Sequence, residues 1–76
     1  MDLLHLRRID RERNMARFYN LAIEPTLFGT VSVVREWGRI GSSGRRRIDL
    51  YEGEAEARDA YAQLSRQKLR RGYIRQ

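Results

Sequence analysis

The chain has 76 residues, no cysteine, one histidine and one tryptophan, and its formal net charge at pH 7 is +6. This length fits one small domain, residues 1–76, and leaves little room for a deep catalytic cleft. The lack of cysteine excludes disulfides and thiolate-bound zinc, and a single His5 argues against a histidine metal site or a Ser-His-Asp triad. We therefore expect no metal, no cofactor and no enzymatic activity, and we interpret His5 as an exposed strand residue.

The charge indicates the class of partner. Basic residues outnumber acidic residues by 16 to 10. Every basic residue except Lys68 is an arginine. Such a balance favours polyanions, with nucleic acid first among them. No stretch approaches the ~20 apolar residues of a membrane span, and the N-terminus does not resemble a signal peptide. We expect a soluble, cytoplasmic protein with no membrane partner.

Four strands are predicted in the first two thirds of the chain. Residues 3–9 alternate in polarity and predict a strand at an edge of the sheet. Residues 15–24 alternate more strongly, and Pro25 ends that strand. Residues 30–40 have the β-branched content that sheets favour, and residues 45–51 return as the fourth strand.

From Glu54 to Arg71 the pattern changes to a helical period. One apolar stripe recurs at the spacing i, i+3, i+4 and i+7, and it consists of Ala57, Ala60, Tyr61 and Leu64. Gly53 is the expected N-cap, and Gly72 lies where helices end in the left-handed conformation. The predicted fold is α+β, an antiparallel sheet of four or five strands covered on one face by a single C-terminal helix.

Trp37 and Arg39 are two residues apart in the third strand, so both project from one face. The hairpin loop at residues 41–44 decides what surrounds them. If the loop has an even number of residues, Trp37 shares its face with Ile48 and Leu50 and belongs to the core.

If the loop is odd or carries a bulge, Val34 and Ile40 join those two apolar residues on one face. We favour this register, because the apolar side chains then gather together. Trp37 and Arg39 would lie on the other, exposed face, beside Arg45 and Arg47.

An indole beside guanidinium groups suits a sugar-phosphate chain. The ring stacks on sugars or bases, while the guanidinium forks bind phosphate oxygens. We interpret Glu36 and Asp49 as counter-charges to Arg35 and Arg47, since no nucleophile is paired with a base.

Three segments follow one another in a distinctive order. They are R-F-Y-N-L-A-I, then V-R-E-W-G-R-I-G-S-S-G-R, and finally a helix that ends in K-L-R-R-G-Y. Together they resemble the WGR domain, a module named for its Trp-Gly-Arg motif and found in eukaryotic poly(ADP-ribose) polymerases and in small stand-alone bacterial proteins. The resemblance covers about residues 7–74 and implies a twisted antiparallel sheet with a helix against it.

The resemblance also implies roles for the motif residues. In the polymerases the domain helps to sense broken DNA ends, where the motif tryptophan packs against the sugar at the end of a strand and the arginine contacts DNA and neighbouring domains. By position these roles would fall on Trp37 and Arg39, with Gly38 free of a side chain so that the backbone approaches its partner closely. The present chain has neither the polymerase domain nor the zinc fingers of those enzymes, so binding is the role that carries over.

The sequence thus favours a non-enzymatic nucleic-acid-binding module that recognises the DNA backbone or a DNA end. The candidate binding residues are Trp37, Gly38, Arg39, Arg45, Arg47 and Lys68. The alternative is a protein–protein interaction module that uses the edge strand at residues 3–9 or the basic face.

Overall fold

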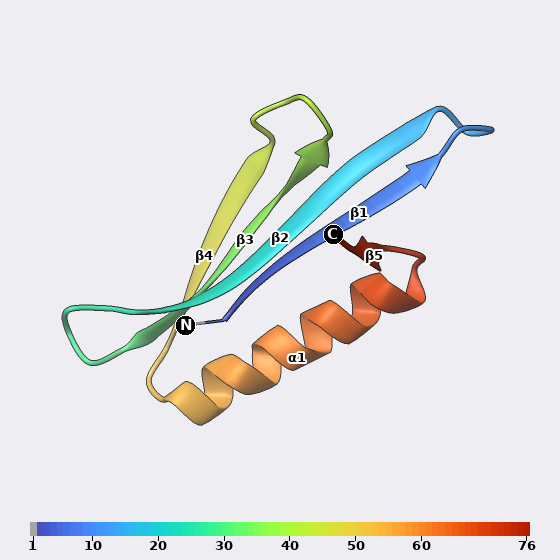
Figure 1. Ribbon diagram of the computed structural model, residues 1–76. Coiled ribbons are helices and arrows are strands. Elements are labelled where there is room, and N and C mark those ends of the chain that lie inside the picture. Colours follow the sequence, from blue (N-terminus) through green and yellow to red (C-terminus); the bar gives the residue numbers. More distant parts are fainter. Residues whose placement is uncertain (1) are drawn as a thin grey trace.

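A computed structural model describes residues 2–76 and shows one sheet with one helix across it (Figure 1). The five strands are antiparallel to their neighbours and lie in the order β4-β3-β2-β1-β5. This arrangement confirms the predicted α+β fold. The elements are β1 (Leu3–Asp10), β2 (Met15–Pro25), β3 (Val31–Arg39), β4 (Arg45–Tyr51), α1 (Glu54–Arg70) and β5 (Ile74–Arg75).

The core lies between the sheet and α1. We call the face covered by α1 the helix side and the other face the open side. Four fully buried side chains reach the core from the strands, and Ala57 reaches it from the helix. The predicted apolar stripe of α1 is confirmed, because its other members pack partly buried against this core. The four strand residues are Leu6, Leu21, Ile23 and Val33.

Glycines mark both ends of α1, as predicted. Gly53 is the N-cap in an extended conformation, and Gly72 adopts a φ of +94° just after the helix. The Tyr73 N–H donates to the carbonyl of Lys68 over 3.1 Å, and the Gly72 N–H donates to that of Leu69 over 3.2 Å. These two bonds form a Schellman motif, which turns the chain back and buries the Tyr73 ring.

The reversal after α1 corrects one prediction. Residues 74–75 form β5, which pairs with β1 through Arg75 opposite Leu6 and Ile74 opposite Arg7. The N–H of Gln76 also donates to the carbonyl of His5 over 3.0 Å. The prediction that residues 3–9 form an edge strand is therefore wrong. A two-residue strand has too little pattern to be recognised from sequence.

The favoured hairpin register is confirmed. Trp37 lies opposite Arg45 and Val34 lies opposite Ile48, so an odd number of residues forms the loop. Antiparallel partners share a face, which puts Trp37 on the same side as Arg45 and Arg47 and Val34 on the other.

The side on which the core forms differs from expectation. α1 covers the face of Trp37, while Ile48 and Leu50 lie on the open side and are 53% and 64% exposed. The reason is the longer apolar series of β2, in which Tyr19 alternates with the buried leucine and isoleucine and lies directly opposite Trp37. The indole is therefore half-buried against the core and does not lie on a fully exposed surface.

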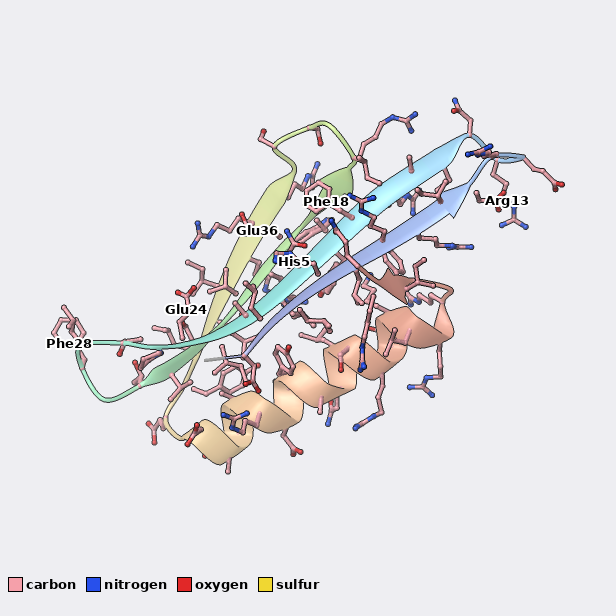
Figure 2. All side chains as sticks on the ribbon, viewed as in Figure 1. His5, Arg13, Phe18, Glu24, Phe28 and Glu36 are labelled. Atoms are coloured by element: carbon pink, nitrogen blue, oxygen red, sulfur yellow. The ribbon has the colours of Figure 1, made fainter. Side chains whose placement is uncertain are left out.

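The open side carries polar and aromatic side chains that face away from α1 (Figure 2). His5 is exposed there, as predicted, and its Nδ1–H donates to Oδ1 of Asn20 over 2.9 Å. Phe18 also lies on this side, because its partner across the ladder is Gly38.

Close packing of the hairpin accounts for Gly38. A Cβ at this position would lie 2.8 Å from the Cα of Gly44 and 3.4 Å from Cε1 of Phe18. Gly44 has a φ of +71°, and a Cβ there would overlap the carbonyl oxygen of Trp37. The missing side chain of Gly38 therefore makes room for the hairpin itself, on the side opposite to the indole.

We predict that Gly44→Ala destabilises the domain more than Gly41→Ala. Both residues have positive φ, but a Cβ at Gly41 meets nothing within 4 Å. Gly41→Ala should cost about 1–2 kcal/mol of unfolding free energy from backbone strain. Gly44→Ala should cost a further ~1–3 kcal/mol from overlap with the Trp37 carbonyl. Urea denaturation followed by circular dichroism measures both, and equal losses would contradict the packing argument.

Candidate nucleic-acid interface

Trp37 lies where the core meets the surface, on the helix side of β3. Its neighbours across the ladder are Tyr19 of β2 and Arg45 of β4. The ring centroids of Trp37 and Tyr19 are 6.4 Å apart, and Tyr19 in turn makes an edge contact with Tyr73 at 6.3 Å. Tyr19, backed by Tyr73, packs against the indole on its core side. These buried tyrosines hold its orientation without a ligand.

A row of three arginines crosses the sheet next to Trp37. Arg39 of β3 lies opposite Arg17 of β2, which lies opposite Arg8 of β1. Side chains directly opposite each other on one face are neighbours, and like charges there repel. Among residues 2–76 no carboxylate forms an ion pair with these arginines, and Arg39 donates from Nη1 to the carbonyl of Asn14 over 3.3 Å. We call this set the arginine row.

Lys68 brings a further positive charge to the same place from the last turn of α1. Its Nζ lies 4.5 Å from the ring centroid of Tyr19 and 5.5 Å from that of Tyr73. Burial lowers the pKa of Lys68 below its usual value, and repulsion by nearby arginines, Arg71 first, lowers it further. In the part of the chain that the structure describes, no carboxylate forms an ion pair with this ammonium group. A bound phosphate would supply the missing counter-charge.

Asp49 links two arginines on the helix side. Its Oδ2 lies 2.8 Å from Nη2 of Arg35, and its Oδ1 lies 3.2 Å from Nε of Arg47. The hydrogen bond from Arg35, followed by that from Arg47, holds the pKa of Asp49 below its ordinary value. The predicted pairing of Asp49 with Arg47 is confirmed. The predicted pairing of Glu36 with Arg35 is wrong, because successive strand residues face opposite sides and Glu36 lies opposite Arg46 on the open side.

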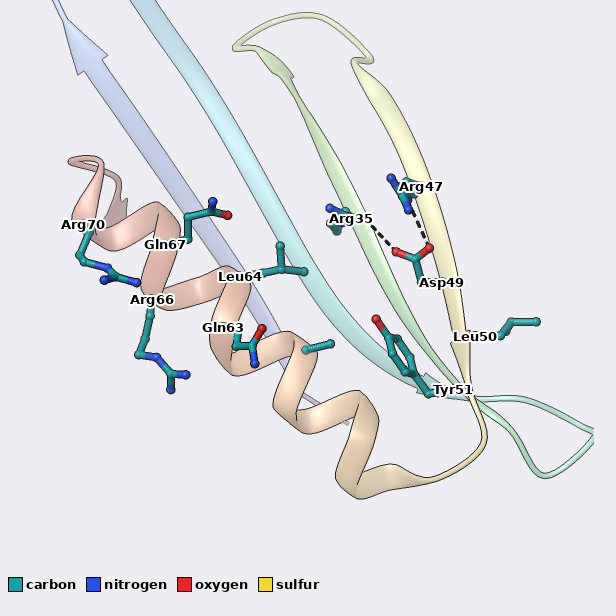
Figure 3. A pocket seen from close by; sticks show the side chains of 11 residues that line it. Arg35, Arg47, Asp49, Leu50, Tyr51, Gln63, Leu64, Arg66, Gln67 and Arg70 are labelled. Atoms are coloured by element: carbon teal, nitrogen blue, oxygen red, sulfur yellow. Dashed lines mark hydrogen bonds and ion pairs between the residues drawn. The ribbon is translucent and has the colours of Figure 1, made fainter.

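Three adjoining cavities form a groove between α1 and the strands. The largest, of about 730 Å³, lies between α1 and the β3–β4 pair (Figure 3). It meets a second cavity of about 190 Å³ at Arg35, Leu64 and Gln67. The second cavity meets a third, of about 180 Å³, at Trp37 and Lys68. We call the whole the helix–sheet groove.

The structure brings most of the predicted site residues together. Trp37 and Lys68 line two of the cavities, Arg45 and Arg39 flank the indole on its own face, and Arg47 lines the largest cavity. Gly38 lines the third cavity, but the position that a Cβ would take at this residue faces the hairpin.

Several neighbours were not predicted. The alternation of residues 15–24 places Arg17 on the face of Tyr19, so this member could have been found from the sequence alone. The others depend on which strands and helix turns meet. They are Arg8, Tyr19, Arg35, Arg66 and Arg70.

Residues 2–76 contain neither a metal-binding cluster nor a membrane-spanning helix. No group of three or more His, Cys, Asp or Glu residues is placed to hold a metal ion. None of the described helices is long and apolar enough to cross a membrane.

Sheet, helix and basic groove define a small α+β binding domain. The family model of the WGR domain matches residues 3–76, and the chain therefore belongs to the WGR domain family. It is similar to the uncharacterized protein y4dW of Sinorhizobium fredii strain NGR234, with 44% identity over 70 residues. That match covers 92% of this chain and 34% of the relative, so the chain spans about a third of the length of this curated protein. No solved structure matches the chain significantly.

We predict that Asp49→Asn lowers the unfolding free energy at pH 7 by about 1–3 kcal/mol, since the Arg35 side chain, which is only 19% exposed, loses its counter-charge. The pKa of Asp49 is lowered in the folded state, so its stabilisation is complete above the ordinary value of 3.8. It is lost as the pH falls through the folded-state pKa. Urea denaturation at several pH values should therefore show the two proteins converging in acid. A constant difference down to about pH 2 would contradict this assignment.

Proposed function

We propose that this WGR domain is a non-enzymatic nucleic-acid-binding module that grips the sugar-phosphate backbone of DNA at a duplex end. The observation that carries the proposal is the arginine row beside Trp37. Its members repel one another, and the ion pairs of the described chain leave them without carboxylates. Phosphates placed there would neutralise the repulsion and release counterions. The arginine row, which destabilises the folded domain, would therefore contribute favourably to the free energy of binding.

The composition of the surface favours backbone contacts over base reading. Guanidinium groups bind phosphate oxygens in a bidentate manner, and Lys68 adds a compact charge. Phosphate contacts position a protein on DNA without reading its sequence. We therefore expect modest affinity, of the order of 10⁻⁴–10⁻⁶ M at physiological salt, with a strong dependence on salt.

The position of Trp37 favours an end over continuous duplex. The indole is half-buried between the arginine row and the last turns of α1, so only an accessible flat face of a ligand reaches it. Inside a duplex each base is covered by its neighbours, whereas a terminal nucleotide exposes one face of its base and sugar. Aromatic stacking on that nucleotide would distinguish an end from the middle of a helix.

Arg45 and Arg46 provide a matched test, because they are adjacent and exposed but face the helix side and the open side respectively. We predict that Arg45→Gln weakens binding to a fluorescein-labelled hairpin duplex and reduces the slope of log K against log salt by about one. Arg46→Gln removes the same charge and should leave the slope unchanged near physiological salt, where distant charges are screened. Equal effects of the two substitutions would contradict the assigned face.

Recognition of a DNA end should distinguish open from closed duplexes. A hairpin duplex with one open end should bind more tightly than a dumbbell of equal length whose two ends are closed by loops. Binding of the open end should change the fluorescence of Trp37, the only tryptophan of the chain. Combining Trp37→Ala with Arg39→Glu should abolish the preference. Equal affinity for the two DNAs would contradict end recognition, and an affinity that does not vary with salt would contradict nucleic-acid binding through phosphates.

A further inference from the structure

The helix–sheet groove continues well beyond Trp37. Its largest cavity extends from Arg35 to Tyr51 between α1 and the β3–β4 pair, and its volume of about 730 Å³ is in the range of binding sites for organic ligands. The two smaller cavities continue it past Trp37 to Tyr73. The helix–sheet groove is therefore extended, and Trp37 and Arg17 of the arginine row line one end of it.

Both walls of the largest cavity are basic. Arg47 lines it from β4, and Arg66 and Arg70 line it from α1 (Figure 3). Asp49 is the one carboxylate among the lining residues, and it is already bonded to two arginines. The Nε of Arg35 is buried and has no hydrogen-bond partner. These walls attract an anion that is longer than a single phosphate group.

Two half-buried aromatic rings lie beside these charges. Tyr51 lines the largest cavity and Trp37 lines the two smaller ones, while Tyr19 and Tyr73, which also line the smaller cavities, are buried in the core. A basic groove with aromatic rings at intervals is the combination by which proteins bind single-stranded nucleic acid, because the charges follow the backbone and the rings stack on successive bases. An acidic peptide would use the arginines but would leave the rings without a partner.

We infer that the helix–sheet groove binds a single-stranded extension of a DNA end, which runs from Trp37 past Arg35 toward Tyr51. This inference rests on the proposed function, since the duplex part is held at the arginine row. A single strand is favoured over a duplex because its bases are unpaired, so their faces can stack on the half-buried rings of Trp37 and Tyr51 that line the groove.

The test compares three hairpin duplexes, one blunt and two with four unpaired thymidines at the 3′ or the 5′ end. At least one extension should bind about tenfold more tightly than the blunt end, as expected for stacking of one further base. Arg66 and Arg70 are exposed, so the double substitution Arg66→Gln and Arg70→Gln should preserve the fold. It should remove this gain and leave blunt-end affinity nearly unchanged.

The matched control removes two charges from the open side by Arg7→Gln and Arg46→Gln, and it should keep the gain. Equal binding of blunt and extended ends, or a gain that survives loss of the two helix arginines, would overturn the inference and leave the proposed function standing. Binding to none of the duplexes would overturn both. Competition by poly-glutamate as effective as that by oligothymidine of equal charge would overturn the single-strand assignment as well.

Discussion

The ion pair between Arg35 and Asp49 sets the boundary between core and groove. Along the helix side of β3, Val33 is fully buried, Arg35 follows it, and Trp37 comes next at the groove. A guanidinium two residues from a fully buried valine loses part of its hydration, and a carboxylate at hydrogen-bond distance offsets that loss. Asp49 provides that carboxylate from β4 at 2.8 Å. The basic surface therefore begins within two residues of the core along β3. The Trp37 indole lies where the core ends and the groove begins.

The two ends of α1 differ in how their charges are paired. Near the start of α1, Arg58 bonds to Asp2 at 2.6 Å and to Glu54 at 3.1 Å. Near its end, Lys68 is surrounded by tyrosine rings and arginines, with a lowered pKa. Acids at the beginning and bases at the end of a helix also suit its dipole. Unpaired cations that lie close together repel one another, and this repulsion costs some stability.

Local patterns predicted the elements well and the contacts between them less well. The alternation of β2 and the helical stripe around Ala57 were sufficient to predict the fold, and parity of the hairpin loop placed Trp37 beside Arg45. The core side was missed because it depends on the summed apolar area of all strands. β5 was missed because pairing of two residues depends on the turn at Gly72. To predict the arginine row, one must know the registers of both the β1–β2 and the β2–β3 ladders. Sequence periodicity gives neither register.

The outer edge of β4 has a consequence for how copies of the domain meet one another. Within residues 2–76 this edge has no neighbouring strand, and it begins with Arg45, Arg46 and Arg47. An unpaired edge invites another strand, and that is a common route to aggregation. Two copies meeting there would bring arginine-rich strands into direct contact, and their repulsion opposes sheet extension. These arginines therefore disfavour pairing between the β4 edges of two copies.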